Sequence, residues 1–168
     1  MEFKIGDKVV YPNHGIGVIE EIQKPSPEEA SGSFYRLRIL ANDSTVTVAA
    51  TNTNHVGLRR VISRKEIEKV LGILQNGDIP VHANWKGRFL ENSNRMRTGE
   101  ILEVAAVLKN LSLLSQHKNL SYRERRMLDK ARYLVISEIA EVEKIPEAQA
   151  EERVDKAVAR SIRHVKDH

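Results

Sequence analysis

The chain has a single tryptophan, and it stands among basic residues in a segment that could contact nucleic acid. The cations that follow Trp85 are Lys86, Arg88, Arg95 and Arg97. An exposed aromatic ring beside such cations can insert at a base step while the cations bind phosphates. The alternative is a ring that packs over the seam between two domains, because tryptophan is highly buried on average. These residues by themselves leave both interpretations open.

A second set of basic residues falls on one predicted helix. Ser121 and Glu124 form a capping box, which predicts a long helix from there to about residue 144. At 100° per residue, three cations lie within about 60° of one another on one flank, and two more lie on the other flank. The first group is Arg123, Arg126 and Lys130, and the second group is Arg125 and Arg132. For any one of them, simple solvation of a helix face is the alternative.

Positive charge is concentrated in the middle of the chain, which has a net charge of +4. Residues 61–135 hold fourteen Lys and Arg against eight Asp and Glu. Residues 1–60 hold seven of each, and residues 136–168 hold six against eight. A neutral first part and a basic second part indicate two modules with different partners.

The first 50 residues have the pattern of short strands separated by turns. We expect strands over residues 3–5, 8–11, 17–22, 34–40 and 45–49, and we interpret Gly15 and Gly17 as turn glycines. The segment 45–49 alternates most cleanly and has neither lysine nor proline to protect an exposed edge. It could accept a strand from another chain, or it could be paired on both sides within its own sheet.

Beyond residue 60 the hydrophobic period becomes that of helices. Ser63 with Glu66 forms another capping box, and Asn84 is a suitable N-cap for a short helix that begins at Trp85. The remaining helices are expected over residues 98–116, 121–144 and from Pro146 onward. We therefore predict an α+β protein, with a small antiparallel β domain over residues 1–60 and an all-α bundle of about five helices over residues 61–168.

Several classes of function are not indicated by this sequence. The absence of cysteine excludes disulfides and thiolate metal sites, and the six histidines are scattered. There is no P-loop, no G-x-S-x-G and no H-E-x-x-H motif. No apolar run approaches the roughly 20 residues of a membrane span. We expect a cytoplasmic protein that is not an enzyme and has no metal, no cofactor and no membrane partner.

Four sequence blocks carry a family resemblance. They are Phe3-x-x-Gly-Asp-x-Val-Val-Tyr-Pro-x-His-Gly-x-Gly17, Val56-Gly-Leu-Arg59, Asn84-Trp85 and Leu120-Ser-x-x-Glu-x-Arg-Met-Leu-x-Lys-Ala-Arg132. Together they resemble the CarD/CdnL family of bacterial transcription regulators and cover essentially the whole chain. A transcription-repair coupling factor carries a similar N-terminal module, whereas the tryptophan and the long basic helix are typical of the small, stand-alone member.

The resemblance implies a Tudor-like N-terminal domain that adds its strand to the RNA polymerase β subunit. It also implies a helical domain that touches promoter DNA just upstream of the −10 element, where the tryptophan wedges into the minor groove and stabilises the open complex. The candidate DNA-binding residues are Trp85, Lys86, Arg88, Arg123, Arg125, Arg126 and Lys130. The candidate polymerase-binding residues are Val46, Thr47, Val48 and Ala49.

Three residues depart from the family pattern. Many relatives have a larger or basic residue in place of Thr47, a proline in place of Ala49 and a basic residue in place of Gly87. Two other functions stay open: an autonomous DNA-binding protein with a helix-turn-helix over residues 98–144, and an interaction module in which Trp85 seals the domain interface. We expect a monomer that is held at the nucleoid through RNA polymerase.

Overall fold

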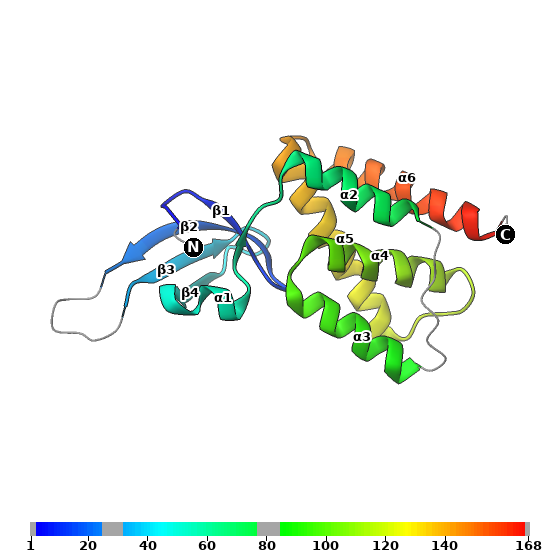
Figure 1. Cartoon of the computed structure of the whole chain (residues 1–168), viewed down its shortest axis with the longest axis horizontal. Coiled ribbons are helices and arrows are strands. Elements are labelled where there is room, and N and C mark those ends of the chain that lie inside the picture. The colour runs from blue at the N-terminus through cyan, green and yellow to red at the C-terminus, as the bar shows by residue number, and fades with distance from the viewer. Residues whose placement is uncertain (1–2, 25–31, 77–84, 167–168) are drawn as a thin grey trace. The chain divides into compact units, whose positions relative to one another are not determined.

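The chain forms two compact units, Met1–Val61 and Ile62–His168. The computed structural model describes residues 3–24, 32–76 and 85–166, with the backbone alone for Trp85, Lys86 and residues 164–166. The first unit contains a sheet and the second is helical (Figure 1), which confirms the predicted α+β class. The predicted N-cap Asn84 lies outside the described residues.

Five antiparallel strands form the sheet of the described part of the first unit. They are β1 (Lys8–Tyr11), β2 (Gly15–Gln23), β3 (Phe34–Ile39), β4 (Thr45–Ala49) and β5 (Arg59–Arg60). Their order across the sheet is β4-β3-β2-β1-β5. Each of the first four therefore pairs with its neighbour in sequence, and β5 returns to β1 after the short helices η1 (Ala50–Asn52) and α1 (Thr53–Val56).

The predicted strand over residues 3–5 is wrong, because residues 4–7 close a turn instead. The N–H of Lys4 donates to Oδ2 of Asp7 at 2.8 Å, and the N–H of Asp7 donates to the carbonyl of Lys4 at 3.0 Å. Short acidic side chains offer the backbone local hydrogen bonds that compete with a strand ladder. Phe3 still reaches the core, where its ring meets that of Tyr35 edge to face at a centroid distance of 5.6 Å.

The two glycines of the Gly-x-Gly segment have different roles. Gly15 has a φ of 91°, a backbone conformation that favours glycine, at the end of the turn after β1. Gly17 lies inside β2, so its interpretation as a turn glycine is wrong. A Cβ at Gly17 would lie 3.3 Å from the carbonyl oxygen of Arg38 on β3, so the close approach of these two strands explains the residue.

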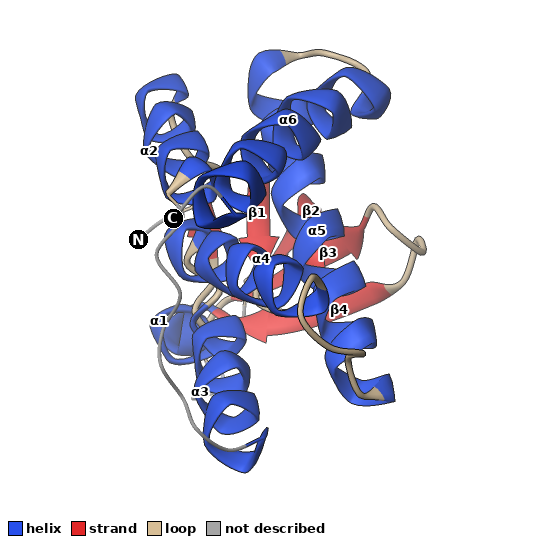
Figure 2. Ribbon diagram, turned by 90° about the vertical axis from the view of Figure 1, so that its right-hand side faces the viewer, coloured by secondary structure: helices blue, strands red, loops and turns tan. Residues whose placement is uncertain are grey.

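Five helices form the described part of the second unit. They are α2 (Arg64–Gln75), α3 (Trp85–Thr98), α4 (Ile101–Ser115), α5 (Tyr122–Glu143) and α6 (Glu147–Lys166). Helix α4 packs against each of the other four, with α2 and α6 on one side of it and α3 on the other (Figures 1 and 2). The shared core includes Leu108 and Leu111 of α4 and Val135 and Ile139 of α5.

Both predicted capping boxes are formed. The Oγ of Ser63 accepts the N–H of Glu66 at 3.4 Å, and the Oγ of Ser121 accepts the N–H of Glu124 at 3.1 Å. In each box the glutamate carboxylate accepts the backbone N–H of the serine in return. The sequence therefore predicted where α2 and α5 begin.

The predicted start of a helix at Thr98 is wrong. Helix α3 is longer than the short helix expected and continues through Thr98, and Gly99, with a φ of 71°, separates it from α4. The Oγ1 of Thr98 donates to the carbonyl of Arg95 at 2.8 Å within α3 and accepts the N–H of Glu100 at 3.1 Å. Threonine thus bridges the end of one helix and the start of the next.

Candidate functional sites

Strand β4 lies at one end of the sheet. It pairs with β3 over five residue pairs, from Phe34 with Ala49 to Arg38 with Thr45. In the described part of the first unit no strand pairs with its other side. Of the two interpretations left open by the sequence, the exposed edge is therefore the one that the fold adopts.

The hydrogen-bond alternation between β3 and β4 fixes which backbone groups face outward. The N–H of Ala50 donates to the carbonyl of Ser33, and the N–H of Ile39 donates to the carbonyl of Ser44, both at 2.8 Å. In an antiparallel ladder, hydrogen-bonded pairs alternate with pairs that are not bonded. The backbone groups that point to the free edge are accordingly those of Thr45, Thr47 and Ala49.

The side chains of β4 hold the strand in place without adding charge to its edge. Val48 is buried in the sheet core and Val46 is half-buried, whereas Thr47 is exposed. The neighbouring cations on β3 are already neutralised by β2: Arg36 is 2.7 Å from Glu21, and Arg38 is 2.6 Å from Glu20. This edge therefore offers backbone hydrogen bonds rather than net charge.

The N-terminal half of α5 carries cations that have no ion-pair partner. Those predicted to bind DNA are all exposed: Arg123, Arg125, Arg126 and Lys130. Across the described residues, none of these four forms a salt bridge. Unpaired cations on a helix face are available to the phosphates of a nucleic acid.

Tyr122 extends this surface, and the sequence interpretation missed it. Tyr122 is 68% exposed, and the guanidinium carbon of Arg126 lies 5.7 Å from the centroid of its ring. An aromatic ring with a cation over its face is a combination that stacks on bases and contacts phosphates. The signal in the sequence was an aromatic residue directly after the N-cap Ser121 and directly before a basic cluster.

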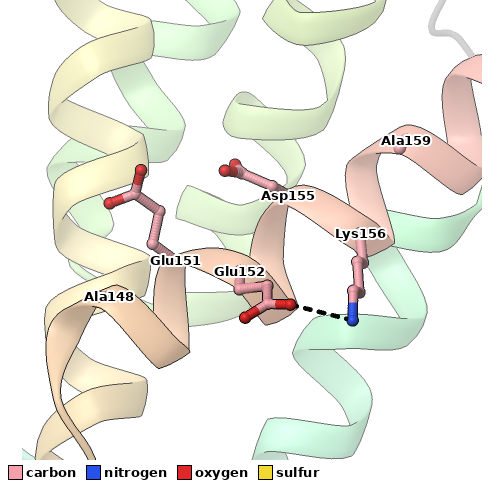
Figure 3. Close-up of a pocket in the computed structure, with 6 residues that line it drawn as sticks. All are labelled: Ala148, Glu151, Glu152, Asp155, Lys156 and Ala159. Carbon is pink, nitrogen blue, oxygen red and sulfur yellow. Dashed lines mark ion pairs between the residues drawn. The ribbon is translucent and has the colours of Figure 1, made fainter.

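The far flank of α5 is different, because Arg132 is paired with α6. Its Nη2 lies 2.9 Å from Oε1 of Glu151 and 2.9 Å from Oδ2 of Asp155. These carboxylates line an open hollow of about 470 Å³ on α6 beside Glu152 and Lys156, which form an ion pair of their own (Figure 3). Such an acidic surface repels a phosphate backbone, so the basic surface is confined to the N-terminal half of α5.

Arg88 does not lie on an open surface. Its side chain is 14% exposed and forms a two-bonded salt bridge with Glu124, which is 1% exposed. The Nε donates to Oε2 at 2.8 Å and Nη2 donates to Oε1 at 3.3 Å. The structure thus joins the first turn of α3, which begins at Trp85, to the first turn of α5.

The pKa of Glu124 reflects this environment. Burial alone would raise it, but the hydrogen bonds and charge of Arg88, with the hydrogen bonds from Ser121, lower the pKa of the carboxyl below its ordinary value. Glu124 is therefore a carboxylate at neutral pH, and Arg88 has a permanent anionic partner.

A metal site and a membrane-spanning helix do not arise in the described ranges 3–24, 32–76 and 85–166. No group of three or more His, Asp and Glu side chains there could hold a metal ion. Within the same ranges, no helix is both long and apolar enough to cross a membrane. The side chains of Trp85 and Lys86 lie outside the described part, so their exposure stays a prediction.

The fold and these two surfaces define a class of protein: a β module with an open strand edge joined to a helical module with an unpaired basic surface. Comparison with known proteins identifies the family. Residues 3–62 match the CarD-like/TRCF RID domain, and residues 69–155 match the CarD C-terminal domain. The chain is 33% identical over 147 residues to YdeB of Bacillus subtilis (strain 168), a protein named as a transcription factor. The match covers 88% of this chain and 96% of YdeB.

The chain belongs to the CarD/CdnL family, as the sequence blocks indicated. This is a family of transcription factors and not of enzymes, and its N-terminal module is an RNA polymerase interaction domain.

Proposed function

We propose that this protein stabilises the promoter open complex as a monomer bound to RNA polymerase. Residues 1–60 would add strand β4 to the polymerase β subunit, and residues 61–168 would contact promoter DNA just upstream of the −10 element. The observation that carries the proposal is the unpaired basic surface of α5, tied by Arg88 and Glu124 to the helix that begins at Trp85. Binding to polymerase would also hold the protein at the nucleoid.

Strand addition at β4 fits the geometry of its free edge. The outward backbone groups of Thr47 and Ala49 can form a ladder with an extended segment of the β subunit, while Val46 and Val48 keep the strand in its own sheet. Because Thr47 is exposed and uncharged, this contact would depend on the backbone more than on side-chain charge. The contact can therefore differ in strength from that of relatives with a basic residue at position 47.

The proposed DNA contact combines a wedge with phosphate binding. Unstacking one base step costs a few kcal/mol, and a ring of Trp85 that fills the gap would lower the free energy of the open duplex relative to the closed one. A stabilisation of about 1.4 kcal/mol shifts that equilibrium about tenfold. Lys86 and the cations of α5 would bind phosphates without reading sequence, so promoter position would be set by polymerase.

The lifetime of the open complex tests this proposal. We expect wild-type protein to lengthen the lifetime on a promoter with bacterial RNA polymerase. The lifetime with Trp85→Ala should be about tenfold shorter than with wild type, although the variant still folds and binds polymerase. A wild type without effect, or a Trp85→Ala variant equal to wild type, would contradict the wedge. Tight, sequence-dependent binding to DNA without polymerase would favour the helix-turn-helix alternative.

A further inference from the structure

The salt bridge between Arg88 and Glu124 joins the starts of two helices. Arg88 lies three residues after Trp85 in the first turn of α3, and Glu124 lies in the first turn of α5. Two hydrogen bonds, at 2.8 and 3.3 Å, connect the guanidinium to both carboxylate oxygens. A planar pair of this kind fixes orientation as well as distance, because both bonds must be satisfied at once.

The same carboxylate is part of the N-cap of α5. Its Oε1 accepts the N–H of Ser121 at 3.4 Å and the Oγ–H of Ser121 at 3.2 Å. Arg88 is therefore bonded to the capping box itself and not to a side chain that can swing freely. Because α3 packs chiefly against α4, this bridge holds the Trp85 end of α3 to the start of the basic surface.

We propose that Arg88 is a positioning residue that, through Glu124, holds Trp85 and the cations of α5 in one fixed arrangement for DNA. This inference rests on the proposed function and replaces the direct DNA contact that the family resemblance implies for Arg88. Arginine has five N–H donors, and here two of them are bonded to a carboxylate that is almost fully buried. The side chain is only 14% exposed, so its other donors have little access to a phosphate, and moving the guanidinium outward would leave the buried carboxylate without its partner.

Three variants separate positioning from phosphate binding: Arg88→Gln, Glu124→Gln and the double substitution. We expect each single substitution to shorten the open-complex lifetime about tenfold, and the double variant to be no worse, because all three break the same bridge. Glu124→Gln is decisive, since it removes a negative charge near the DNA. If Arg88 bound phosphate directly, Glu124→Gln would leave the lifetime unchanged or longer, and that result would overturn the proposal.

Fluorescence of Trp85 supplies a readout that does not need DNA or polymerase. It is the sole tryptophan of the chain, so quenching by acrylamide and emission anisotropy report on the start of α3. We expect both signals to change in Arg88→Gln and Glu124→Gln and to stay unchanged in Arg132→Gln, which breaks the bridge between α5 and α6 instead. If Arg88→Gln and Glu124→Gln fold and leave both the quenching and the anisotropy unchanged, the positioning role is wrong.

Two controls keep the proposal distinct from general stability and from the proposed function. Val154→Ala truncates a fully buried residue of α6, so it lowers stability far from α3 and should leave the Trp85 signals and the lifetime unchanged while folded. If the glutamine variants do not fold, Arg88→Lys is used instead, because it keeps the charge but not the paired geometry. It should shorten the open-complex lifetime. A lifetime equal to that of wild type would favour phosphate binding and overturn the positioning role. If the wild type does not lengthen the lifetime at all, the proposed function fails, and the fluorescence still decides whether Arg88 positions Trp85.

Discussion

The two candidate surfaces of this protein are built on opposite principles. Beside the edge of β4, Arg36 and Arg38 of β3 are neutralised by Glu21 and Glu20, and the free edge offers a row of backbone donors and acceptors. On α5 the backbone is satisfied within the helix, and its N-terminal half offers exposed cations that form no salt bridge with any residue the structure describes. We therefore expect the first surface to bind an extended chain and the second surface to bind a polyanion.

This contrast predicts different sensitivities. Backbone pairing depends on the geometry of a few atoms and responds weakly to salt, whereas phosphate contacts release counterions and weaken steeply as salt rises. Substitutions that alter one backbone group should therefore affect polymerase binding, and substitutions that alter charge should affect the DNA-dependent step. The following experiments test whether the two surfaces are separable in this way.

The largest effect is expected from Thr47→Pro. Proline removes an N–H that points to the free edge and leaves the hydrogen bonds between β3 and β4 intact, so the fold should tolerate it. The partner carbonyl loses its donor and meets the proline ring, so polymerase affinity should fall on the order of a hundredfold. Calorimetry or surface binding with RNA polymerase measures this loss.

Thr47→Val is the matched control, because it changes the same side chain and keeps the N–H. We expect it to bind polymerase within about threefold of wild type, since an exposed side chain adds little to a backbone ladder. If Thr47→Pro folds and binds polymerase as well as wild type, strand addition at β4 is wrong.

A smaller effect is expected when the basic surface is neutralised. Replacing Arg126 and Lys130 by glutamine should shorten the open-complex lifetime about tenfold and lower the slope of log affinity against log salt by about 2, because each cation accounts for about one phosphate contact. Polymerase binding in the absence of DNA should stay unchanged. A salt titration of the complex measures both effects.

Arg132→Gln is the control for this double variant. Arg132 lies on the same helix, but the carboxylates of Glu151 and Asp155 raise its pKa by hydrogen bonding and engage its charge. Its loss should lower stability without changing the salt slope. An equal change of slope in Arg132→Gln would show that the whole helix, and not its N-terminal half, attracts DNA.

Local signals in the sequence predicted much of this architecture. Ser63 with Glu66 and Ser121 with Glu124 marked two helix starts, because a capping box is complete within four residues. The alternating segment Thr45–Ala49 is β4, with the same bounds as predicted. By contrast, Thr98 bridges two helices, and the turn that closes at Asp7 overrode the strand pattern after Phe3.

Contacts between distant residues were not predictable from these patterns. Helical periodicity places Arg88 on α3 and Glu124 on α5, but it carries no information that these residues, 36 positions apart, bind each other. Arg88 was therefore expected, from the family resemblance, to bind DNA directly. The pairing depends on how α3 and α5 pack, which is decided by the whole helical core.

Acid should reveal the bridge without a mutation. The folded pKa of Glu124 is lowered, so its contribution to stability is complete above the ordinary glutamate pKa of about 4.3 and is lost as pH falls through the folded value. The free energy of unfolding, followed by helical circular dichroism in urea, should fall as the pH drops below about 4.3 toward the lower folded pKa of Glu124. Glu124→Gln should reduce that slope, whereas Glu152→Gln, in an exposed pair with Lys156, should not. A slope as steep in Glu124→Gln as in wild type would show that other groups cause the loss.

The smallest effect separates the two capping boxes. Ser63→Ala and Ser121→Ala each remove a side chain that accepts a backbone N–H at a helix start, so each should lower the free energy of unfolding by about 1 kcal/mol. Among the described residues, the glutamate of the α5 box forms a salt bridge with Arg88, whereas Glu66, in the box of α2, has no such partner. Ser121→Ala should therefore also shorten the open-complex lifetime about twofold, while Ser63→Ala leaves it unchanged at the same stability. Equal lifetimes in the two variants would mean that the cap of α5 serves stability alone, and that the start of α3 is positioned by its packing on α4.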